Sequence, residues 1–217
     1  TQKGLACTNV WEAGGLIKSN EEVDYPNIQY HFGPVGFEVV NKSIRVKQGF
    51  VLHVDQLRPK SKGYLKLNAE NVYGKPEIFF NYMTHPNDIK EMSEGIEKGR
   101  EIVNQRSFDE FRGEETTGLS EGIDKNNMKE LIQGLTETDY HPCGTCKMDN
   151  SNEGVVDEQM RVHGVEKLRV IDGSVIPRII SANLNAPIQM IAHRGADYIL
   201  NKSQLNTIKA KFLFEKN

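Results

Sequence analysis

The stretch whose residues are best suited to catalysis surrounds the histidine at position 141. His141 stands between Tyr140 and Pro142, and Gly144 follows shortly after. Proline disfavours a helical conformation in the residue before it, and glycine lets the backbone bend sharply. An imidazole has the side-chain pKa closest to neutrality, so one held on a stiff, non-helical segment suits proton transfer. We therefore predict that His141 is an acid–base residue; the alternative is a hydrogen-bonded structural histidine.

A second stretch of interest lies between residues 168 and 195. Residues 168–171 are apolar enough to predict a short buried strand ending at Asp172-Gly173-Ser174, and Asn185 and Pro187 suit the start of a helix. Strand ends and helix N-termini expose unpaired backbone N–H groups, which bind anions and developing negative charge. The alternative is a capped helix beside a packed strand. The residues alone suggest an acid–base site near an anion-stabilising helix end, and they name no reaction.

Cys143 and Cys146 form a C-x-x-C motif, and Cys7 is the third cysteine of the chain. A thioredoxin-like site needs this motif to open a helix after a strand, and a zinc site needs two further ligands at close spacing. Neither context is visible around residue 143. We therefore expect small packing residues, no metal site and a reducing compartment.

The composition is that of an ordinary globular protein, with 37% hydrophobic and 26% charged residues and a net charge of −3. No basic run is present, so we expect no nucleic-acid partner. No apolar stretch approaches the ~18 residues of a membrane span, and no signal peptide opens the chain. We expect a cytoplasmic or peripherally membrane-associated protein. The first residue is Thr1 rather than methionine, which suggests a fragment that starts in mid-fold.

The first half of the chain predicts several strands without intervening helices, which favours an antiparallel sheet. The expected strands are 5–17 (with a bulge or close backbone approach at its glycines), 27–32, 49–57, 64–67 and 77–82. Turn residues at 58–63 predict a hairpin between the third and fourth strands. A helix from Pro86 to about Val103, a loop over 107–122 and a helix capped by Asp124 follow. The last predicted helix begins near Pro187, giving an α+β chain.

Several motifs resemble the C-terminal signature of the glucose–methanol–choline (GMC) family of FAD oxidoreductases. Those motifs occupy residues 140–148, 155–157, 161–165, 168–174 and 183–187, in the family's order and spacing. Further similarity to the choline-oxidising branch extends over residues 8–15, 26–32, 58–63 and 80–83. The resemblance covers nearly the whole chain.

The resemblance implies a mostly antiparallel sheet with flanking helices as a substrate-binding domain over residues 1–139. Residues 140–204 would then hold the active-site histidine and the last strand and helix of an FAD-binding α/β domain. Residues 205–217 would form a basic tail. The chain contains no Gly-x-Gly, the phosphate-binding turn that opens such a domain. We therefore expect the N-terminal FAD-binding region to be missing and the fragment alone to be inactive and to bind FAD weakly.

The resemblance also implies an enzyme that transfers a hydride from a small alcohol to FAD. His141 would be the base, and Asn183 would hydrogen-bond the substrate oxygen. The positions that would touch FAD are Asp172, Gly173, Asn185, Ala186 and Pro187.

A choline substrate would need a site for its quaternary ammonium group, for which Trp11, Glu12 and Tyr140 are candidates; core packing is the alternative for all three. We interpret the other histidines, at 31, 53, 85, 163 and 193, as structural or exposed. The sequence does not identify the electron acceptor of the enzyme. Alternatives to choline oxidation are another GMC alcohol dehydrogenase or oxidase, a lyase, or a silent binding module.

Overall fold

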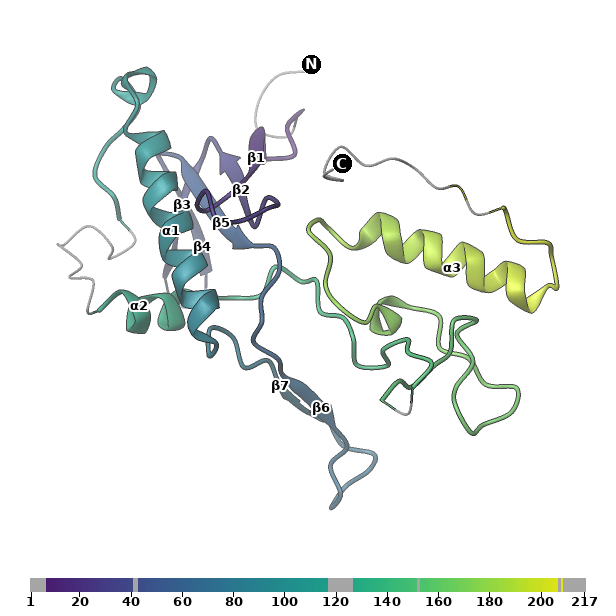
Figure 1. The fold of residues 1–217 in the computed structure, drawn as a ribbon. Coiled ribbons are helices and arrows are strands. Elements are labelled where there is room, and N and C mark those ends of the chain that lie inside the picture. Colours follow the sequence, from purple (N-terminus) through teal and green to yellow (C-terminus); the bar gives the residue numbers. More distant parts are fainter. Residues whose placement is uncertain (1–6, 41–42, 117–126, 152, 207, 209–217) are drawn as a thin grey trace. The chain divides into compact units, whose positions relative to one another are not determined.

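The computed structural model describes residues 7–40, 43–116, 127–151, 153–206 and 208. Its elements fall into two compact units (Figure 1). The first comprises Thr1–His141 and Ile179–Ala182, and the second comprises Pro142–Arg178 and Asn183–Asn217. Each unit is described separately below.

A three-stranded antiparallel sheet forms the centre of the first unit. Strands β1 (Ala13–Ile17), β2 (Ile28–Gly33) and β5 (Val51–Gln56) lie in the order β1-β2-β5. The predicted strand over 5–17 is thus shorter than expected; its residues 5 and 6 lie outside the described chain. The expected close backbone approach is present at Gly14, where a Cβ atom would lie 2.6 Å from the carbonyl oxygen of Tyr30.

Helix α1 (Pro86–Val103) covers one face of this sheet, which we call the helix-covered face. Ile28 and Tyr30 are buried there, and the Tyr30 hydroxyl donates to the carbonyl of Gly95 over 2.6 Å. A Cβ atom on Gly95 would lie 2.9 Å from the Ile28 side chain, and one on Gly99 would lie 3.2 Å from Leu52. Two helical glycines therefore let the helix backbone approach the sheet closely.

The start of α1 matches its prediction, with Pro86 in the first turn and His85 as the N-cap. Asp88 is buried in this turn and accepts hydrogen bonds from the backbone of Lys60 (2.9 Å) and Ser61 (2.8 Å). These bonds tie residues 60 and 61 to the helix. The predicted hairpin across 58–63 is therefore wrong: β6 (Tyr64–Lys66) pairs instead with β7 (Glu77–Phe79).

Smaller elements complete the first unit. Strands β3 (Gly36–Val40) and β4 (Ser43–Lys47) form an antiparallel pair that the sequence pattern did not predict. A 3₁₀ turn, η2 (Arg106–Phe108), lies at the start of the expected loop. Helix α2 (Met128–Leu135) buries Met128 and Ile132 against Met83 and Met92; its predicted cap, Asp124, lies outside the described residues.

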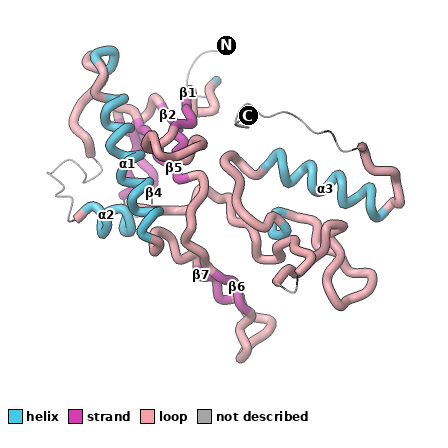
Figure 2. Tube along the Cα trace, viewed as in Figure 1, coloured by secondary structure: helices cyan, strands magenta, loops and turns pink. Residues whose placement is uncertain are grey.

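The second unit is mostly loop apart from α3 (Asn185–Ile199) and the short η3 (Gly173–Val175), as Figure 2 shows. The strand predicted at 168–171 is wrong. This segment makes a single antiparallel bridge, Arg161 to Arg169, and Leu168 is 48% exposed. The prediction fails because its backbone finds partners only around residues 160–162, too few for a ladder.

The N-cap of helix α3 lies one residue before the predicted cap, Asn185. Leu184, which is buried, occupies the N-cap, and its carbonyl accepts from the N–H of Ile188 over 2.9 Å. Asn185 is the first helical residue, and its side chain accepts a hydrogen bond from Gln189 (3.0 Å) instead of capping the helix. Burial of a leucine side chain outweighs the capping preference of asparagine here.

The predicted α+β fold with antiparallel sheets is confirmed. Its division into substrate-binding and FAD-binding parts stays a prediction, and residues 207 and 209–217 of the tail lie outside the described chain. Among the residues that the structure describes, no helix has the length and apolarity of a membrane span.

Candidate active site

The face of the sheet opposite α1 carries polar side chains, and we call it the polar face. Side chains alternate along a strand, so with Tyr30 and Val54 directed toward α1, their neighbours point the other way. Antiparallel pairing sets His31 opposite His53, and Gln29 opposite Asp55. The register therefore gathers two imidazoles, one amide and one carboxylate on one surface.

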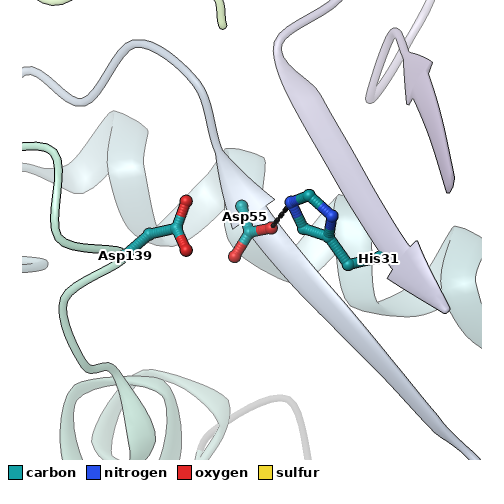
Figure 3. Close-up of side chains that lie close together, drawn as sticks. All are labelled: His31, Asp55 and Asp139. Atoms are coloured by element: carbon teal, nitrogen blue, oxygen red, sulfur yellow. Dashed lines mark ion pairs between the residues drawn. The ribbon is translucent and has the colours of Figure 1, made fainter. Parts of the chain in front are cut away.

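Asp139 joins this surface from the coil after α2, as Figure 3 shows. The Nε2 atom of His31 lies 3.3 Å from the Oδ2 atom of Asp55. One donor atom from each of His31, Asp55 and Asp139 lies within 4.8 Å of the other two. Residues distant in sequence thus form one cluster.

The titratable groups on the polar face shift the pKa values of Asp55 and His53. Burial, reinforced by the negative charge of Asp139, raises the pKa of Asp55 to about 6, although His31 opposes the shift. Burial, with the positive charge of His31, lowers the pKa of His53, and Asp139 opposes that change. The lowered pKa favours an uncharged His53 at neutral pH, and Asp55 titrates about one pH unit below neutrality.

His141 follows Asp139, a member of this cluster, by two residues. Its Nε2 atom is 3.8 Å from the Oδ2 atom of Asp139, and its side chain is 26% exposed. Tyr140 adopts a left-handed φ of 59°, and its N–H donates to the hydroxyl of Thr138 over 2.9 Å. This local hydrogen bond supports the strained conformation of the residue before His141. The imidazole thus sits on a non-helical segment with a carboxylate nearby.

Trp11 and Glu12 line a shallow depression of about 410 Å³ along β1 and β2, together with His31. The indole ring contacts the edge of His53, with centroids 4.5 Å apart, and lies 5.8 Å from the ring of His31. The structure therefore brings Trp11 and Glu12 together. Tyr140 is not among the lining residues, and its side chain is 83% exposed.

The second unit holds the remaining predicted residues at the start of α3 and in η3. Asp172 caps η3 by accepting from the N–H of Ser174 over 2.8 Å. A Cβ atom on Gly173 would lie 2.9 Å from Ile188, so glycine allows η3 and α3 to pack closely. Asn183, Asn185 and Ala186 are exposed. The N-cap residue Leu184 makes no side-chain hydrogen bond to the first turn of α3, and the backbone N–H groups of such a turn suit an electron-rich group such as a flavin carbonyl.

The C-x-x-C motif belongs to the second unit, where Cys143 and Cys146 are partly buried and form no disulfide. Burial raises the pKa of the Cys143 thiol. A raised pKa keeps a thiol protonated and unreactive, which agrees with the expected packing role.

Sequence reasoning missed His31, His53, Asp55 and Asp139. Strand alternation could have grouped the first three, because each directly follows an apolar residue that points to the helix-covered face. No sequence signal brings Asp139 to them, since that approach depends on the path of the coil after α2.

Two solved oxidases share the fold of this chain. Pyridoxine 4-oxidase from Mesorbium loti shares the fold, with a TM-score of 0.72, 21% identity and coverage of 88% of this chain and 38% of that one. A formate oxidase of Aspergillus oryzae RIB40, solved to follow FAD modification, has a TM-score of 0.72 and 26% identity over 82% of this chain and 32% of its own.

The family model described as GMC oxidoreductase matches residues 59–192, well over half of the chain. The chain belongs to the GMC oxidoreductase family. It is 41% identical over 212 residues to the oxygen-dependent choline dehydrogenase of Cronobacter sakazakii, and 40% identical over 209 residues to that of Escherichia coli O45:K1. Each alignment covers 96% of this chain and 37% of the relative, so the chain spans little more than a third of their length.

Proposed function

We propose that this chain is the C-terminal part of an FAD-dependent alcohol dehydrogenase that oxidises choline, or a similar cationic alcohol, to the aldehyde. The observation that carries the proposal is the 41% identity to an oxygen-dependent choline dehydrogenase over 96% of the chain. The wider family supports the reaction class, and the residues below support the substrate and the roles.

His141 acts as the base in this proposal. The alcohol proton passes to an imidazole nitrogen while the carbon–hydrogen bond breaks and the carbonyl forms. Bound FAD would supply the acceptor for the hydride that leaves that carbon. A neutral imidazole can take the proton near neutral pH, and the adjacent Asp139 carboxylate stabilises the imidazolium that results. The stiff segment around Tyr140 and Pro142 limits the directions in which the ring can point.

Asn183 holds the substrate oxygen by donating a hydrogen bond from its amide. The residues proposed to hold FAD are Asp172, Gly173, Asn185, Ala186 and Pro187. Two observations support this assignment: the N-cap residue Leu184 makes no side-chain hydrogen bond to the first turn of α3, and Gly173 lets η3 pack against Ile188 in that turn.

The substrate ammonium group is assigned to Trp11, Glu12 and Tyr140. An aromatic face and a carboxylate are the groups that stabilise a quaternary ammonium ion. Trp11 and Glu12 already line one depression, and Asp55 and Asp139 add negative charge to the polar face. A cationic alcohol is therefore a better match than a neutral one.

The function is tested on the complete enzyme of which this chain is proposed to be part. Choline added without oxygen should bleach the flavin absorbance, and betaine aldehyde should appear in equal amount. A flavin that other alcohols reduce and choline does not would redirect the proposal to another GMC substrate. A preparation without flavin, or with flavin that no alcohol reduces, would favour the binding module or the lyase.

The substrate assignment is tested by Glu12→Gln in the same enzyme. Loss of a partly desolvated charge contact costs about 1–3 kcal/mol, so the KM for choline should rise roughly ten- to a hundredfold while kcat changes less. The control is 3,3-dimethylbutan-1-ol, the neutral alcohol of the same shape. An equal effect on both alcohols would show that Glu12 is structural.

A further inference from the structure

We propose that His31, Asp55 and Asp139 form a binding site for a divalent transition-metal cation of the Zn²⁺ type. The three side chains meet on the polar face of the first unit (Figure 3). The proposal stands on the geometry of this cluster and does not depend on the proposed oxidation of an alcohol.

The spacing of the donor atoms suits a small cation. Zinc lies about 2.0–2.2 Å from nitrogen and oxygen ligands, so two ligands of a tetrahedral site are about 3.4 Å apart. His31 Nε2 and Asp55 Oδ2 already lie 3.3 Å apart. The third donor lies within 4.8 Å of both, so Asp139 must move by about an ångström to complete the set. Its side chain is 55% exposed and stands on a coil, which allows that movement.

The cluster holds more negative than positive charge. The Oδ2 atom of Asp55 is buried and accepts no hydrogen bond from the described residues, although it lies 3.3 Å from Nε2 of His31. A buried carboxylate oxygen without a donor is costly, and a second carboxylate close by adds repulsion. A cation bound between the two carboxylates would satisfy both.

The neighbouring groups are compatible with a cation. The Gln29 amide nitrogen is placed 2.8 Å from His31 Nε2. Rotation of the amide by half a turn would present its oxygen instead, a further ligand of the type that zinc accepts. His53 lies opposite His31 in the strand register, so a second imidazole stands beside the cluster.

One imidazole and two carboxylates favour zinc or cobalt over magnesium. Imidazole nitrogen binds transition metals, whereas magnesium prefers oxygen ligands in octahedral geometry and retains its water. Occupancy would also draw the Asp139 carboxylate, now 3.8 Å from His141, toward the metal. Metal binding and the environment of His141 should therefore be coupled.

The test is metal titration of the 217-residue chain after removal of metals with EDTA. Zn²⁺ is followed by calorimetry and Co²⁺ by its visible absorption, which is intense for tetrahedral and weak for octahedral coordination. The variants are Asp139→Asn and His31→Gln. The control is Asp197→Asn, which removes the carboxylate 3.4 Å from His193 on α3, a histidine–aspartate pair in the second unit.

The wild-type chain should bind one Zn²⁺ and show an intense Co²⁺ spectrum, with Mg²⁺ failing to compete. Asp139→Asn and His31→Gln should each weaken Zn²⁺ binding at least about tenfold, and Asp197→Asn should leave it unchanged. Asp139→Asn alters an exposed side chain, so it decides the matter if His31→Gln fails to fold. Absence of stoichiometric binding, a weak octahedral spectrum, equal affinity in Asp139→Asn, or equal loss in Asp197→Asn would each overturn the proposal.

Discussion

Two aspartates on opposite sides of the central sheet have opposite electrostatic environments. Asp88, at the start of α1, is fully buried and accepts from two backbone N–H groups, the Ser61 hydroxyl and the Gln56 amide. Burial alone would raise the pKa of Asp88, but these hydrogen bonds outweigh it and hold the pKa below its ordinary value. This carboxylate is fully satisfied as an anion.

Asp55, on the polar face, is also largely buried, but its Oδ2 atom accepts no hydrogen bond from the part of the chain that the structure describes. Burial and the charge of Asp139 raise its pKa to about 6. The Asp88 carboxylate on the helix-covered face thus stabilises the fold, whereas the ionised Asp55 carboxylate on the polar face lowers its stability. Groups that are retained at such a cost are common at functional sites.

The largest expected effect on stability follows from removing Asp88. Asp88→Ala leaves several buried donors without an acceptor, so the free energy of unfolding should fall by about 2–4 kcal/mol. Urea denaturation of the chain measures this. The control Glu97→Ala changes an exposed residue of the same helix and should stay within about 0.5 kcal/mol of wild type. If Asp88→Ala matched Glu97→Ala, the structural role of Asp88 would be wrong.

Asp55→Asn should have the opposite effect. The folded pKa of Asp55 lies above its unfolded value, so ionisation of Asp55 costs stability as the pH rises through about 6. In metal-free buffer, Asp55→Asn should raise the free energy of unfolding by up to about 2 kcal/mol at pH 7.5. The gain should shrink as the pH falls and vanish near pH 3, about one unit below the unfolded pKa, where both states of the wild type are protonated. A loss of stability at pH 7.5 would contradict the contrast between the two aspartates.

The pH dependence of Asp88 has the reverse sign. Its folded pKa is depressed, so its contribution is fully present above the unfolded pKa, which is about 3.9, and is lost as the pH falls through the folded pKa. Wild type and Asp88→Asn should therefore converge in stability at strongly acidic pH. Denaturation curves of both proteins at several acidic pH values check this, and a constant difference would disagree with it.

The smallest effects concern the fit between α1 and the sheet. Gly95→Leu places a side chain where a Cβ atom already lies 2.9 Å from Ile28, so it should cost about 1–3 kcal/mol. Gly134→Ala in α2 is the matched control, since no atom lies within 4 Å of its added Cβ. It should stabilise the chain by about 0.5–1 kcal/mol through helix propensity. Thermal unfolding of both variants measures the difference, and equal changes would contradict it.

Local sequence signals predicted the elements they control directly. Pro86 and the apolar periodicity of residues 89–103 predicted α1, because helix start and amphipathicity are local properties. Alternation predicted β2 and β5 for the same reason. The pairing of β6 with β7 could not be derived, because Asp88 fixes the preceding segment from a distant helix.

The sequence likewise predicted only part of the candidate site. The motif around His141 and the family resemblance identified the proposed base, and the family is confirmed by the comparisons. The cluster of His31, Asp55 and Asp139 was not predictable, because it requires both the β2–β5 register and the path of the coil that carries Asp139. Long-range pairing, rather than residue type, creates that site.

Flavin reduction by His141→Ala in the complete enzyme tests the central claim most directly. Stopped-flow mixing with choline in the absence of oxygen isolates the step in which the hydroxyl proton and the hydride leave the substrate. If His141 accepts that proton, the rate of flavin reduction should fall by roughly 10²–10⁴ while bound flavin and fold persist. Asn183→Ala should cost less, since it removes a hydrogen bond and leaves the base in place. A His141→Ala enzyme that reduces its flavin at the wild-type rate would contradict the account.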